Sequence, residues 1–271
     1  MSALRGWLIA GLVFLYLPLL ILVIYSFNES RLVTIWTEFS VKWYVELFKD
    51  EQLMNAFYLS VKIASMTACM ALVLGTVAAY ILVKFGRFPG QALFSSMIVA
   101  PLVMPEVITG LSLLLLFVGL NDVLGWPSSR GAVTIWIAHV TFSVAFVTIL
   151  ISSRLREMDG SLEEAAMDLG APPLKVFFVI TLPLIMPALI SGWLLAFTLS
   201  LDDLVIASFV SGPGSSTLPM VIYSSVRLGV SPKINALATL FVALILAGSF
   251  LAWWSMQRWS AYSTLRQNRD G

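Results

Sequence analysis

Six apolar segments of about twenty residues each constrain this chain more than any other feature of its sequence. They lie at 7–27, 58–83, 93–118, 132–152, 188–210 and 235–256. A helix rises about 1.5 Å per residue, so about twenty residues cross the roughly 30 Å hydrocarbon core of a bilayer. In lipid, such a backbone must satisfy its own hydrogen bonds, and the alternation of a β-barrel strand is absent from these segments. We therefore predict an all-α membrane protein with six transmembrane helices, forming one domain over residues 1–271.

Composition and charge exclude several other classes of protein. Hydrophobic residues make up 59% of the chain and charged residues 11%, against about 45–50% and about 25% in a soluble domain. The net charge of +1 gives no field for holding nucleic acid. Cys69 and His139 are the single cysteine and the single histidine, so an internal disulfide and a metal site built from several of these residues are excluded. We expect His139, in mid-segment, to be packed and hydrogen-bonded.

The distribution of basic residues orients the six helices. Arg5 is the only basic residue before the first apolar segment, and no small-residue cleavage site follows that segment, so we interpret it as a retained helix. Lys84 and Arg87 lie in the very short loop between the second and third segments. Positively charged loops stay in the cytoplasm. This bias predicts that the N-terminus and the C-terminus are both cytoplasmic.

The loop at 153–187, between the fourth and fifth segments, is longer than a helical hairpin requires. Its first half has the pattern of a short helix that Ser161 caps, with Glu163 and Glu164 in the first turn, where the helix dipole favours anions. Gly170 can end this helix, and the prolines that follow prevent its continuation. Helical spacing places four apolar residues on one face: Leu162, Ala165, Ala166 and Leu169. Such a stripe on a cytoplasmic helix fits the groove of a partner protein.

The same loop carries a motif with fixed spacing. Its positions are Glu164, Ala165, Ala166, Gly170, Ile180, Leu182 and Pro183. This pattern resembles the EAA motif of the permease subunits of bacterial ATP-binding-cassette (ABC) importers. The resemblance implies a type I ABC importer permease fold, in which this loop forms the coupling helix that docks on the ATPase. It assigns the coupling role to Glu163, Glu164, Ala165, Ala166, Asp168, Leu169 and Gly170.

The family pattern also specifies partners. The chain has no phosphate-binding loop, because the glycine-rich stretch at 212–215 lacks the required lysine. The chain is therefore expected to be a transport subunit and not an enzyme, with no cofactor of its own and with ATP and Mg bound by a partner ATPase. The implied complex contains two ATPases, a second and different permease subunit, and a periplasmic or lipid-anchored binding protein. Its location is the bacterial cytoplasmic (inner) membrane.

Several segments indicate the cargo. Residues 101–106, 197–203, 211–219 and 230–239 resemble the polyamine-transporting members of the family. This resemblance covers nearly the whole chain and implies putrescine as the first candidate cargo and spermidine as the second.

The acidic residues within the apolar segments support a cationic cargo independently. Glu106, Asp202 and Asp203 lie inside predicted spans, where a charge is costly and faces the bundle interior or water. Carboxylates along a pathway would replace part of the hydration of an ammonium group. Asp202 and Asp203 point about 100° apart on a helix, so one of them can instead cap a broken helix, contribute to a subunit interface or lie at the outer water boundary. Glu106 can instead satisfy backbone freed by nearby prolines, and Tyr223 can offer a cation–π face.

Two other functions were weighed. An intramembrane aspartyl protease needs two carboxylates that converge from separate helices, and Asp202 and Asp203 are neighbours. An ion-coupled secondary transporter or channel for organic cations is the stronger alternative, because buried acids and proline-broken spans also suit it. Dependence on ATP distinguishes it from an ABC importer.

Overall fold

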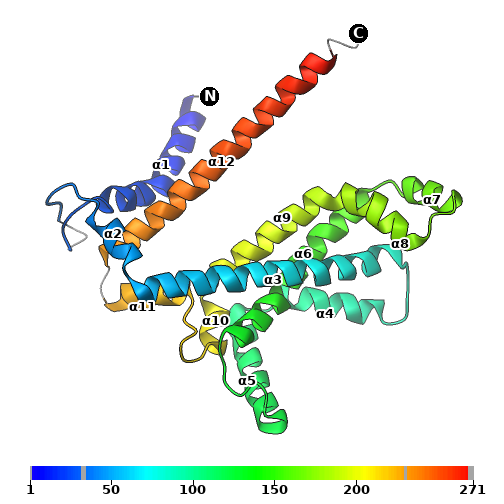
Figure 1. Ribbon diagram of the computed structural model, residues 1–271, viewed down its shortest axis with the longest axis horizontal. Coiled ribbons are helices and arrows are strands. Elements are labelled where there is room, and N and C mark those ends of the chain that lie inside the picture. The colour runs from blue at the N-terminus through cyan, green and yellow to red at the C-terminus, as the bar shows by residue number, and fades with distance from the viewer. Residues whose placement is uncertain (1, 32–34, 229–230, 268–271) are drawn as a thin grey trace. The chain divides into compact units, whose positions relative to one another are not determined.

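The structure is a computed structural model that describes residues 2–31, 35–228 and 231–267, with residues 2–3, 228, 249 and 251–267 described by backbone alone (Figure 1). Most described residues are helical, and the one β-bridge among them joins Asn28 and Phe39. The all-α fold predicted from the apolar segments is confirmed. The chain forms two compact units, Met1–Met54 with Ile222–Gly271, and Asn55–Val221.

The first unit contains the helices from the two ends of the chain. They are α1 (Ser2–Tyr25), α2 (Lys42–Phe48), most of α11 (Leu218–Leu228) and α12 (Pro232–Gln267). α12 contacts both α1 and α2. The Trp43 indole donates a hydrogen bond to the carbonyl of Asn28 at 2.7 Å, and Lys233 forms an ion pair with Asp50 at 2.9 Å. The apolar side chains of α1 are exposed, which suits a helix whose neighbours are lipid or other subunits.

The second unit contains all the functional candidates except Tyr223. It comprises most of α3 (Glu51–Lys84), α4 (Gln91–Val103), α5 (Glu106–Leu124), α6 (Ala132–Glu157), α7 (Ser161–Asp168), α8 (Pro173–Val176), a π-helical turn (Phe177–Thr181), α9 (Leu182–Leu201) and α10 (Val205–Val210). Five described helical segments are long and apolar enough to cross a membrane: Leu4–Tyr25, Glu51–Lys84, Glu106–Leu124, Ala132–Glu157 and Pro173–Leu201. Gln91–Val103 and Pro232–Gly248 are shorter apolar helices.

Helix α6 is the centre of this unit, because it contacts α4, α5, α9 and α10 and contributes to both hydrophobic clusters of the unit. Ile135 and Phe142 pack with residues of α3, α5 and α10, and Val147 and Ile151 pack with residues of α3 and α9. Small residues allow the backbones to approach closely, as is common between membrane helices. A Cβ atom on Gly75 of α3 would lie 2.7 Å from Cγ1 of Val147.

Two predicted spans, 93–118 and 188–210, are interrupted near the prolines and the aspartates for which the sequence left a broken helix open. The first interruption lies between α4 and α5, where Met104 and Pro105 are extended, with ψ of 137° and 135°. Proline disfavours the helical conformation of the residue before it and has no N–H to continue the ladder. The second lies between α9 and α10 at residues 202–204. There the Asp203 carboxylate accepts hydrogen bonds from the backbone N–H groups of Ile206 and Ala207 and so starts a new helix.

Candidate functional site

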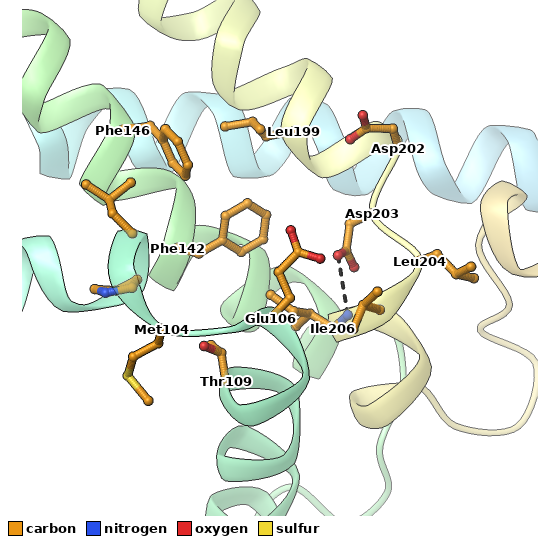
Figure 2. Close-up of a pocket in the computed structure, with 13 residues that line it drawn as sticks. Met104, Glu106, Thr109, Phe142, Phe146, Leu199, Asp202, Asp203, Leu204 and Ile206 are labelled. Carbon is orange, nitrogen blue, oxygen red and sulfur yellow. Dashed lines mark hydrogen bonds between the residues drawn. The ribbon is translucent and has the colours of Figure 1, made fainter.

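The two helix interruptions meet at one cavity. The cavity has a volume of about 340 Å³ and is bounded by the ends of α4 and α5, by α6, and by the link from α9 to α10 (Figure 2). Its lining residues are Pro101, Leu102, Met104, Glu106, Thr109, Phe142, Phe146, Leu199, Asp202, Asp203, Leu204, Val205 and Ile206. The volume falls in the range of about 300–1,000 Å³ found for small-molecule sites.

All three acids predicted within the membrane line this cavity. Glu106 and Asp202 are exposed, and no other residue of the described chain forms an ion pair with either carboxylate. Glu106 lies in the first turn of α5, and Asp202 follows the last residue of α9. Two carboxylates without counter-charges therefore face a space large enough for a small cation.

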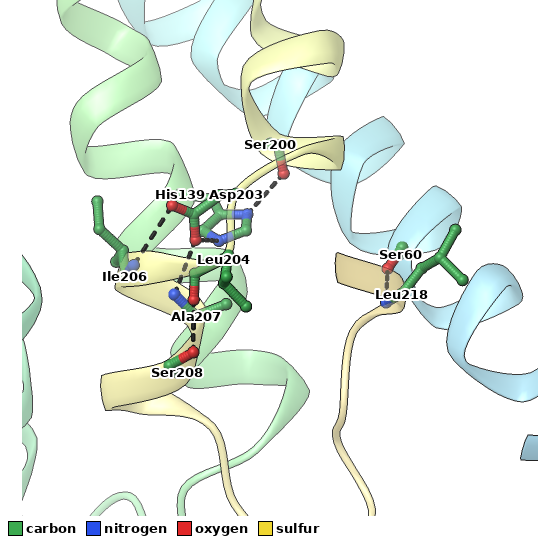
Figure 3. A network of polar contacts seen from close by, with 9 residues as sticks. All are labelled: Ser60, His139, Ser200, Asp203, Leu204, Ile206, Ala207, Ser208 and Leu218. Atoms are coloured by element: carbon green, nitrogen blue, oxygen red, sulfur yellow. Dashed lines mark hydrogen bonds and ion pairs between the residues drawn. The ribbon is translucent and has the colours of Figure 1, made fainter. Parts of the chain in front are cut away.

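Asp203 differs from its neighbour, because its side chain is only 7% exposed. One carboxylate oxygen lies 3.1 Å from Nε2 of His139 and accepts the N–H of Ala207 at 2.7 Å (Figure 3). The other oxygen accepts the N–H of Ile206 at 3.3 Å. Of the alternatives left open by the sequence, helix capping applies to Asp203. His139 is packed and hydrogen-bonded, as expected.

Apolar and aromatic residues form much of the remaining wall of the cavity. Phe142, Phe146 and Leu199 come from α6 and α9, and Thr109 comes from α5 (Figure 2). Aromatic faces attract ammonium groups, and apolar walls accommodate methylene chains. The combination of acids and apolar walls matches an organic cation with a hydrocarbon body.

The fourth predicted pathway residue, Tyr223, does not line this cavity. It lies in α11 and belongs to the first unit, where its side chain is 51% exposed. The guanidinium carbon of Arg227 lies 5.8 Å from the centre of its ring. A role for Tyr223 in cation binding therefore stays a prediction.

The predicted coupling segment forms α7, and Gly170 follows it with a φ of +86°. Its start differs from the prediction by one residue, since Gly160 and not Ser161 is the N-cap residue. The Asp159 carboxylate, one residue before the N-cap, accepts the N–H of Ser161 at 3.0 Å. It thereby satisfies one of the free N–H groups at the start of α7.

The Glu163 side chain points into the protein. Lys84 at the end of α3 donates a hydrogen bond to one carboxylate oxygen, and Thr181 at the start of α9 donates to the other at 2.6 Å. Burial alone would raise the pKa of Glu163, but these two hydrogen bonds and the charge of Lys84 hold that pKa below its ordinary value. Glu163 thus ties α7 to two membrane helices.

The other predicted coupling residues are more accessible. Glu164, Ala165, Asp168, Leu169 and Gly170 are exposed, and Ala166 is half-buried. Leu169 is 90% exposed. Leu169 and the acids beside it therefore form an exposed surface on α7, whose Glu163 is held by Lys84 and Thr181.

The sequence does not indicate which residues bond to the buried acids Glu163 and Asp203 or to His139. It indicates Lys84 only as a signal of orientation, and it gives no signal for Ser200 or Thr181. Their partners are distant in sequence, so no local pattern indicates the pairs. Among the described residues, no group of three or more histidine, cysteine or acidic side chains is arranged to hold a metal ion.

Solved structures share this fold. One is described as a bacterial ABC transporter involved in the import of the acidic polysaccharide alginate. It matches with a TM-score of 0.71 at 18% identity over 93% of this chain and 95% of that one. An amino acid ABC transporter with histidines matches with a TM-score of 0.53 at 20% identity, over 77% and 92%. The fold is the type I ABC importer permease fold.

Proteins of similar sequence show which family with this fold the chain belongs to. The putrescine transport system permease protein PotI of Escherichia coli (strain K12) is 65% identical over 93% of this chain and 89% of the relative. The spermidine/putrescine transport system permease protein PotC of the same strain is 40% identical over 89% of each chain. Residues 71–260 match the family described as binding-protein-dependent transport system inner membrane component. The chain belongs to this family and is a multi-pass inner-membrane transport component.

Proposed function

We propose that this chain is the transmembrane permease subunit of an ABC importer that moves a polyamine, with putrescine as the first candidate, into the cytoplasm. One observation carries the proposal: Glu106 and Asp202 present two unpaired carboxylates to one cavity at two helix interruptions. The relatives that share 65% and 40% of its residues are named for putrescine and for spermidine with putrescine.

The chemistry of the cavity fits a diamine. Putrescine carries an ammonium group at each end of four methylene groups, so it needs negative charge for its ends and an apolar wall for its middle. Glu106 and Asp202 provide the charge, and Phe142, Phe146 and Leu199 provide the wall. Ammonium groups lose water on entering such a site, and ionised carboxylates replace it. An anionic cargo would be repelled by the same groups.

The coupling segment would connect this cavity to a separate ATPase. In the proposed complex, two permease chains, of which the second is a different homologue, meet two ATPases that bind ATP and Mg. A periplasmic or lipid-anchored polyamine-binding protein delivers the cargo. Glu164, Ala165 and Leu169 form the exposed docking face of α7, while Glu163 transmits its movement to α3 and α9 through Lys84 and Thr181.

The transport cycle would be one of alternating access. ATP-driven closure of the ATPase pair moves the coupling helices together and opens the permease pair toward the docked binding protein. The cargo enters between the interrupted helices, where Glu106 and Asp202 hold its ammonium groups. Hydrolysis separates the ATPases and returns the pair to the inward-open state.

The experiment is uptake of labelled putrescine by vesicles that contain the whole complex, with and without ATP and the binding protein. We expect uptake that requires both. The double variant Glu106→Gln with Asp202→Asn should reduce uptake by about tenfold or more, since hydrogen bonds to charged groups contribute about 1.5–3 kcal/mol each. Uptake without ATP would instead favour an ion-coupled secondary transporter or channel for organic cations.

A second experiment tests the docking face. Glu164→Lys reverses an exposed charge on α7 and should separate ATP hydrolysis from putrescine uptake. Glu157→Lys is the matched control, because Glu157 is exposed and forms only a surface pair with Arg154. An equal ratio of putrescine uptake to ATP hydrolysis in the two variants would contradict the docking role of α7.

A further inference from the structure

His139 bridges the two sides of the interruption between α9 and α10. Nδ1 lies 2.6 Å from the Ser200 hydroxyl, near the end of α9, and Nε2 lies 3.1 Å from the Asp203 carboxylate, just before α10 (Figure 3). The histidine itself comes from α6, the central helix of the unit. One side chain therefore fixes both edges of the link that contains Asp202.

For an ionised Asp203 and a neutral His139, chemistry assigns one direction to each hydrogen bond. An ionised carboxylate only accepts, so Nε2 of His139 must carry the proton that it donates to Asp203. In a neutral ring Nδ1 is then the acceptor, and the Ser200 hydroxyl donates to it. Ser200 is 4% exposed and the His139 side chain 1% exposed, so water does not compete for these bonds. Burial makes such a network both strong and intolerant of a missing partner.

Asp203 has little capacity left for a cargo. Its two carboxylate oxygens already accept from His139, Ile206 and Ala207, and its side chain is buried. Asp202 occupies the position between the fixed residues, and its exposed carboxylate lines the cavity. His139 also packs edge-on against Phe142, another residue of the cavity wall, with ring centres 5.7 Å apart.

We infer that His139 is a positioning residue for cargo binding, which acts with Ser200 and Asp203 to hold the α9–α10 link so that the Asp202 carboxylate faces the cavity. The inference rests on the proposed function. It divides the two aspartates into a cargo ligand, Asp202, and a structural residue, Asp203.

The test is a double-mutant cycle read by ATP-dependent uptake of labelled putrescine in vesicles that contain the whole complex. His139→Leu replaces the imidazole by a side chain of similar size that cannot form either hydrogen bond, and it should lower uptake about tenfold. His139→Gln keeps a donor and an acceptor and should recover most of the activity. In the Asp202→Asn background, His139→Leu should cause little further loss, because residues that act as one unit are non-additive.

A matched control separates positioning from general damage to α6. Ser143 lies one turn further along the same helix, is fully buried, and its hydroxyl has no hydrogen-bond partner in the described chain. Ser143→Ala should leave uptake unchanged. ATPase activity and recovery of the assembled complex report folding for each variant.

The outcomes distinguish a failure of the inference about His139 from a failure of the proposed function. Wild-type uptake with normal kinetics in His139→Leu would overturn the inference alone. The inference would also be overturned if His139→Leu lowered uptake by the same factor in the Asp202→Asn background as in the wild type. That result would show that His139 acts independently of Asp202 and has a purely structural role. Absence of ATP-dependent putrescine uptake by the wild-type complex would overturn the proposed function and, with it, the inference.

Discussion

Two pairs of adjacent acids, Glu163 with Glu164 in α7 and Asp202 with Asp203 at the cavity, are arranged in the same way. In each pair one acid is buried and paired, and its neighbour is exposed. Glu163 bonds to Lys84 and Thr181 while Glu164 is exposed. Asp203 bonds to His139 and to the start of α10 while Asp202 is exposed.

The two regions differ in what the buried acid holds. Glu163 joins α7 to α3 through a charged lysine and to the residue before α9 through a threonine. Asp203 joins the start of α10 to His139 of α6, which in turn contacts Ser200 of α9. The first arrangement suits the transmission of a movement, and the second suits the fixing of a cavity wall. The comparison teaches that two adjacent acids can differ in role, because one is buried and hydrogen-bonded and the next is exposed and free to meet another molecule.

The largest effect is expected at the coupling helix. Glu163→Lys would place a second ammonium group beside Lys84 in a site where those side chains are only 12% and 21% exposed. We expect ATP-dependent putrescine uptake to fall to about a tenth of the wild-type rate or less, because breaking a buried ion pair leaves an uncompensated charge. The double variant Lys84→Glu with Glu163→Lys should recover most of it. If the double variant recovers no uptake, the opposite charges of Lys84 and Glu163 are not what connects α7 to α3.

The second prediction separates the members of the cavity doublet. Asp203→Ala removes a helix cap and leaves His139 without its partner, so the free energy of unfolding should fall by about 1–3 kcal/mol. Asp202→Asn should leave that free energy unchanged within error and lower only uptake. Thermal unfolding of the purified complex, measured beside uptake, checks both. Equal destabilisation by the two variants would remove the distinction between them.

The sequence predicted the helices well, because a membrane imposes a length and an apolar composition on each transmembrane helix, and both can be recognised from a short stretch of sequence. It indicated proline-broken spans and an aspartate that can cap a broken helix, but it did not locate the breaks, since hydropathy does not report whether Pro105 ends a helix or Asp203 starts one. It identified the acids but not which member of each doublet is buried. That choice depends on Lys84 and His139, which are 79 and 64 residues away from their partners.

The third prediction concerns pH. The pKa of Glu163 is lower in the folded protein than its ordinary value, which is about 4.3 for a glutamate. The stabilisation from its ion pair is therefore fully present above that ordinary value and is lost as pH falls through the lowered pKa. The melting temperatures of wild type and Glu163→Gln should differ by a constant amount near neutral pH and converge in acid. A difference that grows in acid would contradict the lowered pKa.

The smallest effect is expected where α7 ends. Gly170 has a φ of +86°, and a Cβ atom there would meet no other atom within 4 Å, so Gly170→Ala should cost only the backbone strain of about 1 kcal/mol. Gly160 provides the matched control at the start of α7, since its φ of −63° suits alanine and space is also open. Gly160→Ala should therefore be neutral or slightly stabilising. If the exposed face formed by Glu164 and Leu169 needs this helix end, Gly170→Ala will lower the ratio of uptake to ATP hydrolysis more than Gly160→Ala does. Equal ratios would show that Glu163 alone holds the docking face in place.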